Sequence, residues 1–153
     1  MTAIKSDGGI QQRRDVGLGR LFVLLAREFT RRALARLAAA GFDDINLSHL
    51  LILAHIPTEG LRASDVAERA GLTKQAVSKT LSELKQRGYI VTKSDPSDRR
   101  AQVITYTDRG LALFEIGVDI ADGVEAEMAT FLPNGRLESI KADLVKLREA
   151  TGA

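Results

Sequence analysis

Residues 62–106 decide the fold, and they read RASDVAERAGLTKQAVSKTLSELKQRGYIVTKSDPSDRRAQVITY. The first half carries apolar residues at helical spacing and is divided by a glycine, so it predicts two short helices, Arg62–Ala70 and Thr73–Arg87. After Gly88 the period changes from about 3.6 to 2. Two runs rich in β-branched residues then flank the polar loop 94–100, a pattern that predicts a β-hairpin.

Two short helices joined by a tight turn and followed at once by a hairpin are the layout of a winged helix-turn-helix. Gly71 gives the turn its backbone freedom, and Thr73 is placed to cap the second helix. The apolar spacing predicts that Ala76, Val77, Thr80, Leu81 and Leu84 face inward. The other side of this helix is then left for solvent or a ligand.

The flanking segments are predicted to be helical. One long helix is expected from Arg14 to Ala40, Ser48 is expected to cap a short helix that ends at Ile56, and two helices are expected after Asp108. The predicted fold is mainly α with a small β-hairpin (α+β). We divide the chain into a disordered arm (1–12), an N-terminal dimerisation helix with its linker (13–46), a winged helix-turn-helix lobe (47–107) and C-terminal dimerisation helices (108–153).

The exposed side of the second short helix has the chemistry of a DNA reader. A helix fits the major groove, where Gln75 is suited to adenine and Lys74 to guanine, while Thr73, Ser78 and Lys79 are suited to phosphates. Basic residues outnumber acidic ones from 72 to 109, and the reverse holds from 110 to 153. Lysine, glutamine and serine are also common solubilising residues on a helix, so it is the neighbouring hairpin that favours DNA binding.

The hairpin and the strand after it resemble the MarR family of transcriptional regulators. The residues that carry the resemblance are Asp95-Pro96-Ser97-Asp98-Arg99-Arg100-Ala101, followed by Ile104, Tyr106-Thr107 and Gly110. The resemblance implies that Arg100 enters the minor groove while Asp98 orients the loop, and a narrow minor groove does attract arginine. Tyr106 departs from the family, which usually has leucine there, and we expect it to alter strand packing. The full set of candidate DNA contacts is Arg62, Thr73, Lys74, Gln75, Ser78, Lys79, Asp98, Arg99 and Arg100.

The outer helices need a further role, because the winged helix-turn-helix uses only the central residues. Their wide apolar faces predict burial by association. The resemblance implies a two-fold homodimer, repression as the commoner mode of action, and a small aromatic or phenolic effector held between the dimerisation region and the DNA-binding lobe. Arg27 and His49 are the candidate ligand-facing residues. A monomeric bundle and a packed or surface histidine are the alternatives.

Several classes of protein are disfavoured by what the sequence lacks. The chain has no cysteine, which excludes disulfides, thiolate metal sites and a cysteine redox switch. No phosphate loop, dinucleotide fingerprint or nucleophile elbow is present, so we expect neither an enzyme nor a cofactor. The two histidines suggest no metal site, and the polar start of the chain suggests a cytoplasmic protein without a secretory signal. A winged-helix protein–protein adaptor without DNA binding remains the alternative, although an adaptor would have little reason to keep Lys74, Lys79, Arg99 and Arg100.

Overall fold

The computed structural model describes residues 13–94 and 101–152. It confirms the predicted fold, which is mainly helical with a small antiparallel sheet. The elements in chain order are α2 (Leu18–Ala39), α3 (Leu47–Leu53), β1 (Leu61–Arg62), α4 (Ala63–Ala70), α5 (Lys74–Gln86), β2 (Ile90–Ser94), β3 (Gln102–Tyr106), α6 (Asp108–Ala129) and α7 (Arg136–Thr151). The arm at 1–12 lies outside the described residues.

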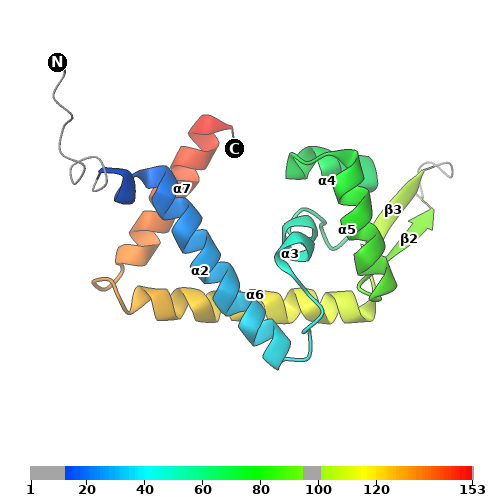
Figure 1. Ribbon diagram of the computed structural model, residues 1–153, viewed down its shortest axis with the longest axis horizontal. Coiled ribbons are helices and arrows are strands. Elements are labelled where there is room, and N and C mark those ends of the chain that lie inside the picture. The colour runs from blue at the N-terminus through cyan, green and yellow to red at the C-terminus, as the bar shows by residue number, and fades with distance from the viewer. Residues whose placement is uncertain (1–12, 95–100, 153) are drawn as a thin grey trace, which may run out of the picture.

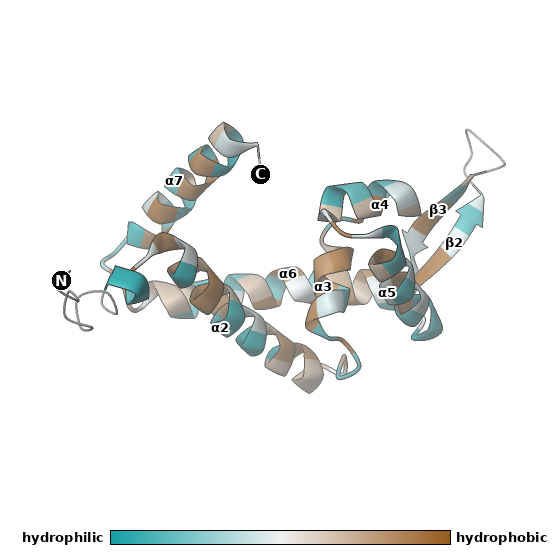
Figure 2. Ribbon diagram, turned by 45° about the horizontal axis from the view of Figure 1, so that its top comes forward, coloured by the Kyte–Doolittle hydropathy of each residue, from teal (hydrophilic) through white to brown (hydrophobic). Residues whose placement is uncertain are grey.

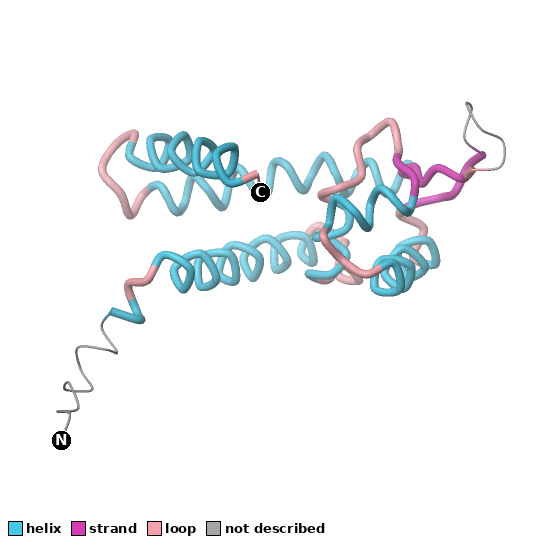
Figure 3. Tube along the Cα trace, turned by 90° about the horizontal axis from the view of Figure 1, so that it is seen from above, coloured by secondary structure: helices cyan, strands magenta, loops and turns pink. Residues whose placement is uncertain are grey.

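The long helix α6 organises the molecule. It runs from the hairpin at one end to α7 at the other, and α2 crosses it on the way (Figure 1). Arg32 and Arg36 of α2 both form ion pairs with Glu127 of α6, which hold this crossing. Seen from above, α7 folds back from the end of α6 that lies away from the winged-helix lobe (Figure 3). Within the described residues, no helix combines the length and apolarity needed to cross a membrane.

The hydrophobic core lies in the lobe formed by α3, α4, α5, the sheet and the start of α6. Val66, Val77 and Leu84 bring α4 and α5 together there, and each is almost fully buried. Tyr89 is also fully buried, and its hydroxyl donates a hydrogen bond to Asp44. The Arg109 side chain lies over the Tyr89 ring at 4.6 Å and donates to its hydroxyl oxygen at 2.9 Å. Burial, followed by the Asp44 hydrogen bond, raises the pKa of Tyr89.

The sheet has three strands, in the order β1-β3-β2, where the sequence predicted only a hairpin. Leu61 and Arg62 were expected to precede or begin a helix, but they pair antiparallel with Ile104 and Val103 of β3. Gly60 makes this approach possible, since its φ is +96° and a Cβ there would lie 2.7 Å from the carbonyl oxygen of Ile104. The pairing is non-local, so the local pattern of residues 61–70 does not reveal it.

Two further local expectations are wrong. The N-cap of α3 is Asn46 rather than Ser48: its side chain accepts from the His49 N–H at 3.0 Å, and the His49 ring accepts from the Asn46 N–H in return. This reciprocal capping box satisfies two backbone donors at once, which Ser48 inside the helix cannot do. Ala76 lies in the first turn of α5 and is exposed, whereas Val77, Leu81 and Leu84 are buried as expected.

Hydrophobic residues, brown in Figure 2, recur along α2 and α7 at the end of the molecule away from the lobe. Many of their large apolar side chains are exposed. The helix α7 buries none of its residues within the chain. The first half of α2 is likewise exposed on every side. The exposed apolar residues of these two helices are Leu18, Leu21, Phe22, Val23, Leu24 and Leu25 in α2, and Ile140, Leu144, Val145 and Leu147 in α7.

Candidate nucleic-acid interface and adjoining cavity

The helix α5 begins as the sequence predicts. Gly71 ends α4 in the left-handed conformation, and the Thr73 hydroxyl accepts a hydrogen bond from the Ala76 N–H at 3.2 Å. The buried residues of α5 hold one side of the helix against α3 and α4. The five candidate DNA contacts at the start of this helix are all exposed: Thr73, Lys74, Gln75, Ser78 and Lys79.

The hairpin extends beside α5 (Figure 1). Its strands pair in register from Ile90 opposite Tyr106 to Ser94 opposite Gln102. Asp98, Arg99 and Arg100 lie outside the described residues, so their role as DNA contacts stays a prediction. Arg62, the remaining candidate, is partly buried in β1 beside β3, at the N-terminus of α4. The structure therefore gathers five candidates on α5 and sets Arg62 apart on the sheet.

His49 joins α3 to α5. Its Nδ1 accepts from the Asn46 N–H at 3.2 Å, so a neutral ring carries its hydrogen on Nε2 and donates it to the Glu83 carboxylate at 3.0 Å. Arg87 lies 3.5 Å from the same carboxylate oxygen. The hydrogen bond from His49, and then that from Arg87, lowers the pKa of Glu83. The carboxylate therefore stays ionised and ties α5 to α3.

His49 and Arg27, the two residues expected to face a ligand, do not line a common cavity. His49 is fully buried and both of its ring nitrogens are engaged within the protein. Arg27 is exposed on α2 and lines a shallow cavity together with Leu24, Leu34 and Leu47. Neither residue lines the more apolar cavity between α2, α3 and α6.

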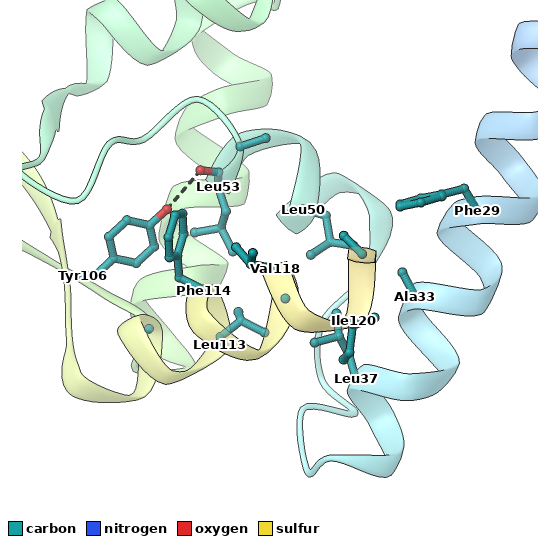
Figure 4. Close-up of a pocket in the computed structure, with 14 residues that line it drawn as sticks. Phe29, Ala33, Leu37, Leu50, Leu53, Tyr106, Leu113, Phe114, Val118 and Ile120 are labelled. Carbon is teal, nitrogen blue, oxygen red and sulfur yellow. Dashed lines mark hydrogen bonds between the residues drawn. The ribbon is translucent and has the colours of Figure 1, made fainter. Parts of the chain in front are cut away.

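An apolar cavity of about 340 Å³ lies where α2, α3 and α6 meet the end of β3 (Figure 4). Phe29, Leu50, Leu53, Phe114 and Val118 supply much of its wall. Gly110, Gly117 and Ala121 leave room along α6, because they carry little or no side chain. Among the described residues, Tyr106 is the one lining residue with a polar side chain, and no charged side chain lines the cavity.

Sequence reasoning missed the residues that line this cavity. Three helices distant in the chain build it, and only the small residues at helical spacing on α6 hint at it. Tyr106 is buried, as an effect on strand packing would require, but its place at the cavity was not foreseen. Over 13–94 and 101–152, His, Asp and Glu side chains form no group of three that could hold a metal ion.

The elements and their order define a winged-helix protein. A family model described as MarR family matches residues 43–101, which include α3, β1, α4, α5 and β2. This match confirms, over those residues, the resemblance read from the sequence. No curated protein sequence matches the chain.

Several solved structures resemble the chain over most of its length. MepR, a transcription regulator of the Staphylococcus aureus multidrug efflux pump MepA, is 25% identical, with 88% of this chain and 98% of MepR covered and a TM-score of 0.65. The reduced form of MarR from E. coli is 19% identical, with coverages of 86% and 96% and a TM-score of 0.73. CouR from Rhodococcus jostii, bound to p-coumaroyl-CoA, is 21% identical, with coverages of 87% and 92% and a TM-score of 0.68. The last two likenesses concern the fold alone.

Proposed function

We propose that the protein is a homodimeric, sequence-specific DNA-binding transcriptional regulator that acts as a repressor. The observation that carries this proposal is the exposed polar and basic side of α5, which stands beside the hairpin and whose opposite side is buried in the lobe. A rigid helix of this kind suits the major groove, where Lys74 and Gln75 read base edges. Ser78, Lys79 and the Thr73 hydroxyl hold the backbone, and Arg100 enters the minor groove.

The dimer is formed by the segments 13–46 and 108–153. The support for it is the exposed apolar side chains of α2 and α7, together with the absence of any buried residue in α7. A helix of this length is only marginally stable in water without tertiary packing. A second copy that covers α7 would stabilise it and would set two α5 helices for two half-sites of DNA.

The DNA-binding proposal is tested by selecting duplexes from a random library with the full chain. We expect a defined sequence to emerge, with an affinity that falls steeply as salt is raised, because bound lysines and arginines release counterions. Arg100→Ala is expected to cost about 1–3 kcal/mol of affinity for the selected duplex. Lys146→Ala on α7, which removes an equal charge far from the lobe, serves as the control.

Two outcomes of that experiment contradict DNA binding. Selection that enriches no sequence, or binding that is indifferent to salt, favours the protein–protein adaptor. An Arg100→Ala protein that binds the selected duplex as tightly as the wild type removes the minor-groove contact from the proposal.

The cavity suggests an effector that is small, aromatic and uncharged. Its wall is apolar, and burial of an unpaired anion costs several kcal/mol, so a carboxylate or sulfonate has no partner there. Occupation of this cavity, between the outer helices and the lobe, would relieve DNA binding. Among the solved structures of similar fold, that of CouR contains bound p-coumaroyl-CoA, which is a precedent for ligand binding but does not identify the ligand of this chain.

A matched pair of fluorescent probes tests the class of ligand. N-phenylnaphthylamine is neutral, and anilinonaphthalene sulfonate has the same ring skeleton with an added anion. We expect the neutral probe to bind saturably and at least about tenfold more tightly, which is roughly 1.4 kcal/mol. Gly117→Leu should abolish this binding, since open space at the Gly117 Cβ position lets a leucine fill the cavity.

Equal affinities for the two probes would refute the selection against charge. Undiminished binding to the Gly117→Leu protein would show that the probe occupies another site. In either case the effector proposal falls while the DNA-binding proposal stands.

A further inference from the structure

Tyr106 connects the cavity to α3. It is the last residue of β3 and is 7% exposed, and its ring packs beside Phe114 at 5.9 Å between centroids. Its hydroxyl lies 3.0 Å from both the Leu53 and the Ile56 carbonyl oxygens (Figure 4 shows the bond to Leu53). One side chain therefore lines the cavity with its ring and binds the end of α3 with its hydroxyl.

The two carbonyls that accept this hydrogen bond lie at the end of α3 and just beyond it. Leu53 is the last residue of α3, where carbonyl groups lack partners within the helix. Ile56 lies beyond the end of α3, in the segment that leads to β1. Burial raises the pKa of Tyr106 to about 12, so the hydroxyl keeps its hydrogen at physiological pH and shares it between the two acceptors. Loss of that donor removes one hydrogen bond from each of the two carbonyl groups.

The opposite end of α3 is bound to α5. His49, in its first turn, donates to Glu83 of α5, and this carboxylate is also held by Arg87. Leu50, in the next turn, and Leu53, at its end, line the cavity. The short helix α3 thus touches the cavity, the end of β3 and the DNA-reading helix at the same time.

We infer that the Tyr106 hydroxyl is a positioning group that couples occupancy of the cavity to the placement of α3 and, through His49 and Glu83, of α5. This inference rests on the proposed DNA-binding function. A ligand against the Tyr106 ring displaces the hydroxyl from the Leu53 and Ile56 carbonyls and releases the end of α3. Without the hydroxyl, the cavity still fills, but its occupancy no longer changes the affinity for DNA.

The test measures a coupling factor: the affinity for N-phenylnaphthylamine without the selected duplex divided by that with the duplex at saturation. Linkage makes this factor equal to the effect of the probe on DNA binding. For the wild type we expect about 5–150-fold, the usual range for allosteric coupling. For Tyr106→Phe we expect the affinity for the probe without DNA to stay within about threefold of wild type and the factor to fall below about 2, because the ring remains and only the hydroxyl is lost.

Tyr89→Phe is the matched control. It removes the same hydroxyl from another buried tyrosine, which is bound to Asp44 and Arg109 and does not itself line the cavity. We expect this protein to keep the wild-type coupling factor even if its stability falls. Equal loss of coupling in both variants would mean general loosening of the lobe and would overturn the inference.

Hydrogen exchange on the wild-type protein keeps the inference testable if Tyr106→Phe does not fold. The Ile56 N–H donates to the same Leu53 carbonyl that Tyr106 binds. Addition of the neutral probe should speed exchange in residues 54–56 and in α5. Unchanged exchange in these residues, or wild-type coupling in the Tyr106→Phe protein, would refute the role of Tyr106. Either outcome would leave the effector proposal standing. If the wild-type protein binds both the probe and the duplex and shows no coupling between them, both the role of Tyr106 and the effector proposal are refuted.

Discussion

The Gly110→Ala protein is expected to lose more than about 4 kcal/mol of its free energy of unfolding, a loss that few single substitutions reach. Gly110 lies in the first turn of α6, and a Cβ there would stand 2.0 Å from the carbonyl oxygen of Tyr89. That oxygen is fixed, because it accepts from the Thr107 N–H at 3.0 Å within the turn between the lobe and α6. Alanine favours a helix over glycine by only about 1 kcal/mol, so the clash outweighs the propensity.

Urea unfolding at one fixed protein concentration measures this loss, since a dimer makes the midpoint depend on concentration. Gly117→Ala in the same helix is the control. A Cβ at Gly117 meets no atom within 4 Å, so this protein should be more stable than wild type by about 0.4–1 kcal/mol. A Gly110→Ala protein with the wild-type midpoint would mean that α6 can move away from Tyr89 at little cost.

The parts of the fold that could be predicted from the sequence are those set by neighbouring residues. Gly71 in the left-handed conformation and the Thr73 cap fix the start of α5 within a few positions. The change of period after Gly88 locates β2 and β3 for the same reason. Asn46 shows the limit of such signals, because Ser48 is an equally good cap residue and only the reciprocal bond with His49 decides between them.

The parts that could not be predicted depend on residues far apart in the chain. The two-residue strand β1 exists only because it pairs with β3. His49 and Glu83 are 34 residues apart, and no local pattern marks either as the partner of the other. The cavity likewise requires the packing of α2 and α3 on α6, and neither Arg27 nor His49 lines it. Candidate DNA contacts on α5 were easier to find, since exposure on a helix follows its period.

A Leu144→Glu protein is expected to be monomeric at micromolar concentration and to bind the selected duplex about 10²–10⁴-fold more weakly, the usual advantage of two linked contacts. Ile140, Leu144 and Leu147 lie on one face of α7, by the period of the helix, and all three are exposed in the single chain. A second copy that covers this face would have to bury the glutamate, which costs several kcal/mol without a cation.

Sedimentation of both variants and binding of the selected duplex measure the effect. Ala142→Glu is the control, because it adds the same charge to α7 on nearly the opposite side of the helix from Leu144, at a position that is also exposed. Leu144 contributes no buried side chain to the lobe, so the lobe of the Leu144→Glu monomer should remain folded and should keep its salt-dependent, weaker affinity for DNA. A Leu144→Glu protein that still sediments as a dimer would show that α7 is covered by something other than a second copy. A monomer with undiminished affinity would show that each chain reads its DNA alone.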